Sequence, residues 1–239
     1  MGSTPSRVVG FDGGYAEYML APIEHLVALP DEIGLAQAAP LPCAGLTTYT
    51  GFRKAAPAPG QRTVVIGVGG PGHLTISIGA AFGGRVYAVT SSRNKVQDAL
   101  ERGAALAGSA EDVARRLHDD GGAEVVLNTV DDLGPLATIM TEVAIGAKIV
   151  LAAAADTLLP IDALQFLTHQ LQVFGTFFGS PGDLEELLAL AVTHGIRPQI
   201  EGYRGRGRQP GPGQPPQQQG SVSRRGGVLT DFRQSARRT

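Results

Sequence analysis

One glycine-rich segment, residues 67–72 with the sequence GVGGPG, constrains the fold more than any other part of the chain. It ends the apolar, β-branched run TVVIGV (63–68), which is typical of a strand buried on both faces. A helix-like segment, residues 72–82, follows directly. A glycine-rich turn between a buried strand and a helix indicates a Rossmann-type unit, and it predicts a pyrophosphate cradle on the free N–H groups of the helix N-terminus.

The glycines of this loop have separate expected roles. Gly67 permits the sharp exit from the strand, and Gly69 lacks the Cβ that would keep the backbone away from a pyrophosphate. Gly72 lets the helix pack closely against the sheet. The alternative interpretation is a glycine-rich turn in an unrelated α/β fold.

Residues 61–195 alternate between strand-like and helix-like segments at a regular pace. This alternation indicates repeated strand–helix–strand units and predicts an α/β domain with a doubly wound parallel Rossmann sheet. Strands are expected at 63–68, 85–90, 124–130, 147–153 and 171–178, with a weaker candidate at 104–109, and helices at 72–82, 94–104, 134–144, 161–170 and 182–195.

The flanking regions differ from this pattern. Residues 1–60 suggest strands at 13–20 and 25–30, then helical segments across 34–55 that break at Pro40 and Pro42. Residues 204–220 contain only Arg, Gly, Gln and Pro, so 204–225 are expected to be disordered, and 226–232 to form one returning strand. A reading-frame slip and recovery in the coding sequence is one hypothesis for this stretch. The expected division is therefore 1–60, 61–195 and 196–239.

Charge and cysteine content narrow the function classes. The chain carries a formal net charge of −2, but residues 202–239 hold eight Arg against one Asp, so the remainder is acidic at −9. The Arg-Gly tail raises RNA binding as a minor hypothesis, weakened by the absence of an aromatic residue between Tyr203 and Phe232. A single cysteine, Cys43, excludes an intrachain disulfide. With no apolar run of about 18 residues and no signal-peptide pattern, a cytoplasmic protein without membrane contact is expected.

The end of the second expected strand indicates which dinucleotide is bound. NAD-binding folds place an acidic residue there to bond the ribose 2′-OH. Here the sequence is Thr90-Ser91-Ser92-Arg93-Asn94-Lys95, without a carboxylate before Asp98. Hydroxyls and cations suit a 2′-phosphate, so NADP(H) is favoured over NAD. The alternative is that Arg93 and Lys95 are only solvated residues of the next helix.

Four blocks of the chain resemble the medium-chain, zinc-type alcohol dehydrogenases. They are GGYAEYMLAP, AAPLPCAGLTTYTGF, VVIGVGGPGH and GDLEELLALA, and the likeness covers residues 9–200. The stretch at 90–95 is most similar to the NADP-dependent cinnamyl-alcohol and aldehyde reductase branch. The resemblance implies a Rossmann domain with a partial GroES-like β catalytic domain at 1–60, hydride transfer between nicotinamide and a small alcohol or aldehyde, and a homodimer formed through the last Rossmann strand.

The resemblance also assigns residues. It implies that Cys43 matches a ligand of the catalytic zinc, that Thr47 lies against the nicotinamide, and that backbone at 152–154 and 178–180 holds the carboxamide. The expected cofactor-binding set is Thr47, Gly67, Gly69, Gly70, Pro71, Gly72, Thr90, Ser91, Ser92, Arg93, Lys95, Thr129, Val130, Ala152, Ala153, Phe178 and Gly179.

The chain departs from the family at the zinc. It holds no second cysteine and no Gly-His-Glu motif, both of which the family places before the first matching block, so an N-terminally truncated member with impaired activity is expected. Cys43 is then expected to be a buried small residue rather than a ligand, and His73 to be structural. Three hypotheses remain: an NADP-dependent alcohol or aldehyde oxidoreductase, a non-catalytic NADP(H)-binding remnant, and RNA binding through the tail.

Overall fold

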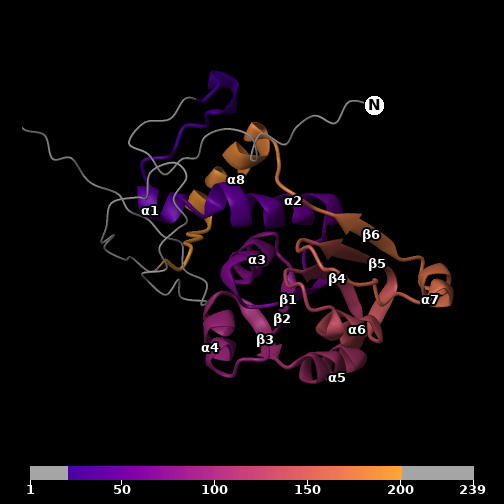
Figure 1. Ribbon diagram of the computed structural model, residues 1–239. Coiled ribbons are helices and arrows are strands. Elements are labelled where there is room, and N and C mark those ends of the chain that lie inside the picture. Colours follow the sequence, from indigo (N-terminus) through magenta and orange to yellow (C-terminus); the bar gives the residue numbers. More distant parts are fainter. Residues whose placement is uncertain (1–20, 201–239) are drawn as a thin grey trace, which may run out of the picture.

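The computed structural model describes residues 21–200 of the chain, and a parallel sheet of six strands lies at its centre (Figure 1). The strand order is β3-β2-β1-β4-β5-β6, so the chain moves outward from β1 in one direction and then returns to build the other half from β4. The strands are β1 (Arg62–Ile66), β2 (Arg85–Val89), β3 (Ala104–Gly108), β4 (Ala123–Asn128), β5 (Val143–Leu151) and β6 (Gln172–Gly175).

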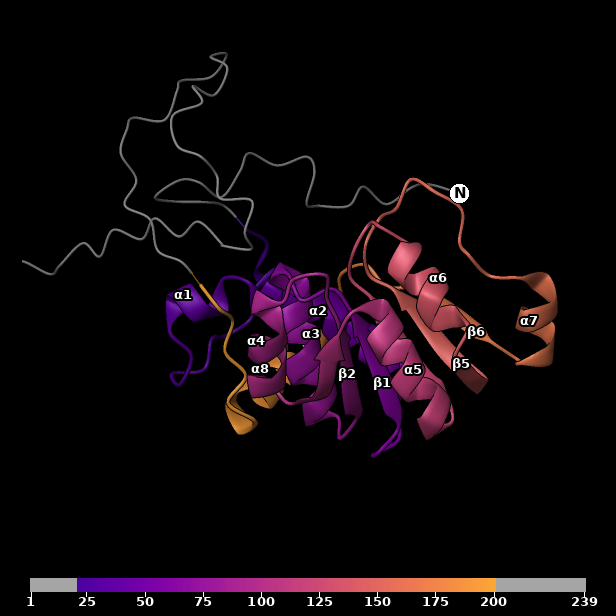
Figure 2. The same ribbon diagram turned by 90° about the horizontal axis from the view of Figure 1, so that it is seen from below.

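Helices cover both faces of this sheet, as the two views show (Figures 1 and 2). The helices that connect and follow the strands are α3 (Gly70–Ala81), α4 (Asn94–Glu101), α5 (Ala110–Asp120), α6 (Gly134–Met140), α7 (Ala163–Thr168) and α8 (Pro181–Thr193). Before the sheet lie the 3₁₀ turn η1 (Ile23–His25), α1 (Leu35–Ala38), the π-helical turn η2 (Leu41–Gly45) and α2 (Leu46–Ala55).

Alternating side chains of the central strands form a core on each face. On one face Val64 and Ile66 pack with residues of α5 and α6, such as Leu117 and Leu136. On the other face Val125 and Leu127 of β4 pack against α2, α3 and α8. Because both faces are covered, the strands are nearly continuous apolar runs, which is what made them readable from the sequence. The predicted α/β class with a doubly wound parallel sheet is confirmed.

Helix α2, although it precedes the first strand, is joined to the sheet by a buried aromatic ring and by two lysine side chains. The Phe52 ring is fully buried and stacks on Phe82 with ring centroids 5.5 Å apart. Two ammonium groups reach carbonyls where α2 meets the sheet: Lys148 Nζ donates to Ala55 O, and Lys54 Nζ donates to Gly175 O at 2.7 Å. Helix α2 therefore shares the hydrophobic core of the sheet that follows it in the chain.

Three details of the predicted elements are wrong. The strand expected at 25–30 is η1 followed by extended backbone without a paired strand among residues 21–200, because alternation alone supplies no neighbour to pair with. The chain breaks near Pro40 but not at Pro42, which lies in the first turn of η2 where no N–H is needed. The helix expected at 134–144 ends at Met140, and β5 begins at Val143.

One helix was not predicted. Helix α5 begins with a capping box, in which the Ser109 hydroxyl accepts from the Asp112 N–H and the Asp112 carboxylate accepts from the Ser109 N–H. Its apolar residues at 110, 113, 114 and 117 follow helical spacing and are buried.

Several predictions lie outside the described residues: the strand at 13–20, the disorder at 204–225, the strand at 226–232 and the RNA-binding tail. The partial β catalytic domain proposed for 1–60 stays a prediction. Within residues 21–200, no helix has the length and apolar character that crossing a bilayer requires.

Candidate dinucleotide site

The strand order places a topological switch point between β1 and β4. Helices α3 and α4, which follow β1 and β2, lie on one face of the sheet. Helix α6, which follows β4, lies on the other face. In open α/β sheets the carboxyl ends of the two strands at such a point form the ligand site. Residues 67–72 and 129–130 directly follow β1 and β4, so the structure brings these two predicted segments together.

Gly67 and Gly72 are required by the geometry of the loop. Gly67 has a φ of +96°, and a Cβ on it would lie 2.5 Å from Val130 Cγ1 and 2.9 Å from Thr129 Oγ1. A Cβ on Gly72 would lie 1.9 Å from the carbonyl oxygen of Gly67. The predicted sharp exit at Gly67 is therefore present, and the close approach at Gly72 is to the loop's own backbone.

The N-terminus of α3 is open toward the switch point. Its N-cap, Gly69, offers no side chain, and a Cβ there would meet nothing within 4 Å. By contrast, Ser109, Asp162 and Ser180 cap the N-termini of α5, α7 and α8. Pro71 has no N–H, so the donors of this turn are the N–H groups of Gly70 and Gly72. Because no side chain caps them, they are available to an anion.

Positive charge gathers where β2 ends. Arg93 and Lys95 are exposed, and neither side chain has a partner among the residues that the structure describes. The first carboxylate after the strand, Asp98, is neutralised by Arg102 at 3.0 Å. The Thr90 hydroxyl accepts from the Ser92 N–H at 3.2 Å, which shapes the turn that carries Ser91 and Ser92. This end of β2 therefore has donors and cations available to a phosphate.

The residues after β4 support the glycine-rich loop at 67–72, the proposed pyrophosphate cradle, from the other side. We call this segment the phosphate loop. The Thr129 hydroxyl donates to Ile66 O at 2.8 Å, and Asn128 Nδ2 donates to Val130 O at 2.7 Å. Asn128 is fully buried, yet its Oδ1 has no partner within the described residues. A buried oxygen of this kind is satisfied in proteins by an ordered water or by a ligand. Sequence reasoning missed Asn128, although its place at the end of a switch-point strand was a usable signal.

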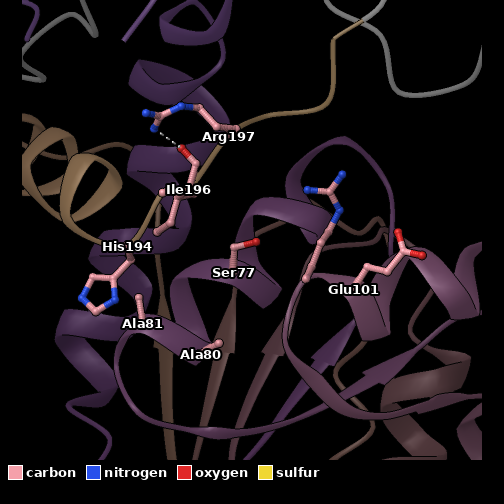
Figure 3. A pocket seen from close by; sticks show the side chains of 9 residues that line it. Ser77, Ala80, Ala81, Glu101, His194, Ile196 and Arg197 are labelled. Atoms are coloured by element: carbon pink, nitrogen blue, oxygen red, sulfur yellow. Dashed lines mark hydrogen bonds between the residues drawn. The ribbon is translucent and has the colours of Figure 1, made fainter. Parts of the chain in front are cut away.

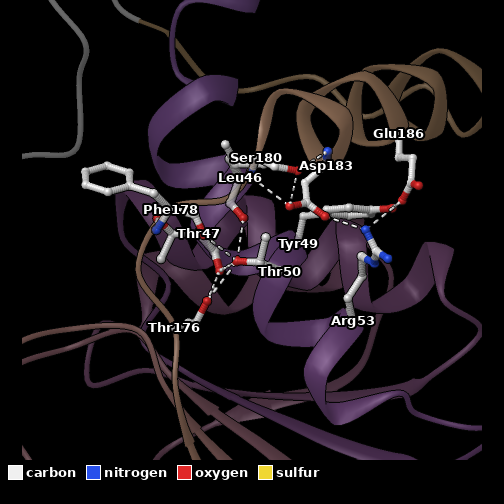
Figure 4. Close-up of polar contacts among 10 residues, drawn as sticks. All are labelled: Leu46, Thr47, Tyr49, Thr50, Arg53, Thr176, Phe178, Ser180, Asp183 and Glu186. Atoms are coloured by element: carbon white, nitrogen blue, oxygen red, sulfur yellow. Dashed lines mark hydrogen bonds and ion pairs between the residues drawn. The ribbon is translucent and has the colours of Figure 1, made fainter. Parts of the chain in front are cut away.

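The remaining predicted residues lie at the ends of β5 and β6. Ala152 N donates to Asn128 O at 2.9 Å, so Ala152 and Ala153 leave β5 beside the end of β4. Beyond β6, Phe178 N lies 3.4 Å from the Thr47 hydroxyl of α2 (Figure 4). The structure thus brings Thr47 and Phe178 together, as the resemblance implied.

The loop after β6 joins a polar cluster that sequence reasoning did not find. Arg53 of α2 forms ion pairs with Asp183 and with Glu186, the latter at 3.1 Å (Figure 4). The Tyr49 hydroxyl donates to Glu186 at 2.7 Å. Burial, and then this bond to Glu186, raise the pKa of Tyr49 to about 12. The cluster joins α2 to α8.

Another hollow lies away from the phosphate loop. A pocket of about 430 Å³ is lined by the carboxyl-terminal half of α3, the end of α4 and the segment after α8, including Ser77, Glu101 and His194 (Figure 3). Arg197 at its rim is already bonded to Ala191 O and Ile196 O. This pocket lies at the opposite end of α3 from the phosphate loop.

His73 joins the phosphate loop to the segment after α8. Its Nδ1 lies 3.1 Å from Gly69 O, and its Nε2 accepts from Gln199 N at 3.1 Å, so the ring is neutral with the proton on Nδ1. The residue is buried. The expectation that His73 is structural agrees with these contacts.

Replacing His73 with glutamine should flatten the pH dependence of stability on the acid side of neutrality. Burial lowers the pKa of His73 from its usual 6.5, so below that pH the unfolded chain binds a proton here that the folded chain does not. The stability from the neutral ring is complete above pH 6.5 and falls as the pH drops through the lowered pKa. Urea unfolding at about pH 5 and about pH 8 measures this. The exposed His194, changed to glutamine, is the control. If the free energy of unfolding changes with pH by the same amount in both variants, the prediction is contradicted.

Residues 70–193, more than half of the chain, match the family model described as zinc-binding dehydrogenase. The chain belongs to this family. The resemblance to the zinc-type alcohol dehydrogenases is thereby confirmed.

Individual relatives of the chain are alcohol dehydrogenases. The chain is 31% identical to alcohol dehydrogenase of Geobacillus stearothermophilus over 193 residues, which are 80% of this chain and 57% of that protein. It is 29% identical to NADP-dependent alcohol dehydrogenase C 1 of Mycolicibacterium smegmatis, over 79% of this chain and 54% of that one. A cinnamyl alcohol dehydrogenase structure from Sorghum bicolor superposes with a TM-score of 0.65 at 30% identity, over 74% of this chain and 51% of that one. The chain spans about half the length of the curated relatives it matches.

The described residues of this chain do not form the zinc site that the family description implies. Cys43 lies in η2 and is exposed, so the expectation of a buried small residue is wrong: η2 turns this side chain away from the core. Within residues 21–200, no group of three or more His, Cys, Asp or Glu side chains could hold a metal ion. A catalytic zinc needs three protein ligands, and Cys43 would supply one of the three.

Proposed function

We propose that this protein binds NADP(H), with the pyrophosphate on the N-terminus of α3 and the 2′-phosphate at the end of β2. The observation that supports this choice over NAD is the pair of cations Arg93 and Lys95, which have no partner within residues 21–200, while the first carboxylate after them, Asp98, is paired with Arg102. A phosphate dianion gains charge-assisted hydrogen bonds from such side chains, whereas a ribose hydroxyl gains little.

The double variant Arg93→Ala/Lys95→Ala is expected to weaken NADPH binding by at least about tenfold, because each lost charged hydrogen bond is worth about 1.5–3 kcal/mol. Binding of NADH should change by less than about twofold, because NADH has no 2′-phosphate. Titration of nicotinamide fluorescence measures both. Arg115→Ala, an exposed arginine on α5, is the control and should leave both affinities unchanged. If the wild-type chain binds neither nucleotide at millimolar concentration, the proposed function is wrong.

We further propose that the protein is an alcohol or aldehyde oxidoreductase that moves hydride between nicotinamide and a small alcohol or aldehyde. Its alcohol dehydrogenase relatives support this reaction class, and the contact of Thr47 with Phe178 supports a nicotinamide position beside α2. In such enzymes a bound zinc polarises the substrate oxygen. Within residues 21–200, Cys43 is the only residue that the resemblance places at such a site, and no cluster of ligands there completes it.

The alternative is an NADP(H)-binding protein without catalysis, favoured by the lack of a three-ligand cluster within residues 21–200. Zinc content distinguishes the two. An active zinc-type enzyme should hold about one catalytic zinc per chain, measured by mass spectrometry after purification without chelators. A metal-free chain that still binds NADPH supports the alternative.

A homodimer through the last strand is also proposed. β6 lies at an edge of the sheet, and large apolar side chains near it are exposed: Leu164 by 67%, Leu167 by 74% and Phe177 by 76%. An unpaired edge beside apolar surface is suited to pairing with a second copy. Light scattering on the full chain measures the mass, and a monomer at micromolar concentration contradicts this proposal.

A further inference from the structure

The loop after β6 is fastened to α2 by two threonine hydroxyls outside the expected set of site residues. Thr50 Oγ1 and Thr176 Oγ1 lie 2.8 Å apart (Figure 4). Thr176 Oγ1 also lies 2.9 Å from Thr47 O, and Thr50 Oγ1 also lies 2.9 Å from Phe178 O. We call Thr50 and Thr176 the threonine clamp.

The clamp is buried, and this raises the value of its hydrogen bonds. Thr50 is 7% exposed and Thr176 is 6% exposed. A buried hydroxyl without a partner is costly, and a hydroxyl has only one proton to donate. The Thr50 hydroxyl also has acceptors on its own helix, Leu46 O at 3.0 Å and Thr47 O at 3.1 Å. In the arrangement that links the loop to α2, Thr176 donates to Thr50 and Thr50 donates to Phe178 O, which uses both protons. This arrangement holds the Phe178 carbonyl against α2.

Glycines on both sides allow the close approach that the clamp needs. A Cβ on Gly179 would lie 2.6 Å from Thr50 Cγ2. A Cβ on Gly51 would lie 3.0 Å from Val150 Cγ1 and 3.3 Å from Thr176 Cγ2. The loop and α2 therefore meet at a distance where a methyl group would push them apart.

Phe178 is the residue whose position depends on this contact. Its φ is +61°, a left-handed conformation that is costly for an aromatic residue and persists only where the surroundings hold it. Its N–H faces the Thr47 hydroxyl at 3.4 Å, too long for a strong hydrogen bond. That N–H is therefore able to donate to a ligand oxygen placed beside Thr47.

We infer that Thr50 and Thr176 are positioning residues for the nicotinamide end of the cofactor. They hold the Phe178 backbone so that its N–H can donate to the carboxamide oxygen, and they touch no ligand themselves. The inference rests on the proposed NADP(H) function. It predicts that the clamp affects the nicotinamide half of the cofactor and not the 2′-phosphate half, which binds at the end of β2.

The experiment compares two ligands on the full chain: NADPH, and 2′,5′-ADP, which has the adenosine 2′-phosphate but no nicotinamide. Thr176→Val and Thr50→Val keep the side-chain shape and remove the hydroxyl. Each should weaken NADPH binding by about five- to tenfold and change 2′,5′-ADP binding by less than about twofold, the size expected for one neutral hydrogen bond. Fluorescence titration and competition give both constants.

Two controls separate positioning from folding. Thr48→Val makes the same change on α2 at a fully buried residue. Within residues 21–200 its hydroxyl bonds to Ala44 O and Gly45 O of the preceding turn η2 and not to the loop after β6, so the change should leave NADPH affinity unchanged. Thr176→Ser keeps the hydroxyl and should retain the wild-type affinity.

Each remaining outcome decides the matter. Equal weakening of both ligands, or no weakening of NADPH, overturns the positioning role. A wild-type chain that binds 2′,5′-ADP as tightly as NADPH also overturns it, yet leaves phosphate recognition intact. A wild-type chain that binds neither ligand overturns the proposed function itself.

Discussion

Replacing Gly72 with alanine is expected to abolish dinucleotide binding and to destabilise the fold by at least about 2 kcal/mol, within the range for forcing an extra carbon into a packed site. The new Cβ would lie 1.9 Å from Gly67 O and 2.7 Å from Gly67 C. Both atoms belong to backbone, so no side chain can rotate to make room. Either the loop opens or α3 moves away from β1, and both changes displace the N–H groups that face the pyrophosphate.

The sign of this effect makes it informative. Within a helix, a Gly→Ala change ordinarily stabilises a protein by about 0.4–1 kcal/mol. Gly182→Ala is the matched control, because it lies in the first turn of α8 and its Cβ would meet nothing nearer than 3.8 Å. Thermal unfolding and NADPH titration of both variants measure the contrast. A Gly72→Ala protein as stable as Gly182→Ala would contradict the loop geometry.

Replacing Phe52 with alanine should cost about 3–5 kcal/mol of unfolding free energy, the usual loss for a fully buried aromatic ring. The ring packs beneath Gly79 of α3, where a Cβ would lie 2.8 Å from Phe52 Cζ, and it stacks on Phe82. The cavity would therefore open between α2 and α3. Since α3 carries the phosphate loop, NADPH affinity should fall together with stability.

Phe177→Ala is the control for this prediction, because that ring is 76% exposed and its loss should change stability by less than about 0.5 kcal/mol. Urea unfolding followed by circular dichroism measures both variants. A small loss for Phe52→Ala would mean that α2 folds independently of the sheet, contrary to the shared core.

The fold was readable from the sequence where local pattern and global environment agree. Strand β1 is apolar from Val64 to Ile66 because it is buried on both faces, and Gly67 and Gly72 mark contacts that exclude a Cβ. Helix α5 carried an equally clear signal, since Ser109 and Asp112 form a capping box, and that signal was overlooked. The strand expected at 25–30 was wrong for another reason: pairing depends on a neighbouring strand, which a local pattern does not reveal.

The site was readable only in part, because much of it depends on contacts between distant segments. Thr47 and Phe178 came from a family resemblance, and the structure places them together. The roles of Thr50 and Thr176 depend on a contact across 126 residues of sequence, which no local spacing encodes. Cys43 was expected to be buried because, without further zinc ligands, a free cysteine usually behaves as a small buried residue, yet burial depends on which way η2 turns.

The two ammonium–carbonyl bonds near α2 have a consequence for chemical labelling. The chain contains only three lysines, and two of them, Lys54 and Lys148, have their amines bonded to backbone carbonyls. Each must break that bond before it can react with an acylating reagent. Lys95 is exposed and has no such bond within the described residues. Mild acetylation should therefore modify Lys95 first among the lysines, and bound NADPH should protect it, which makes one lysine a mass-spectrometric reporter of cofactor occupancy.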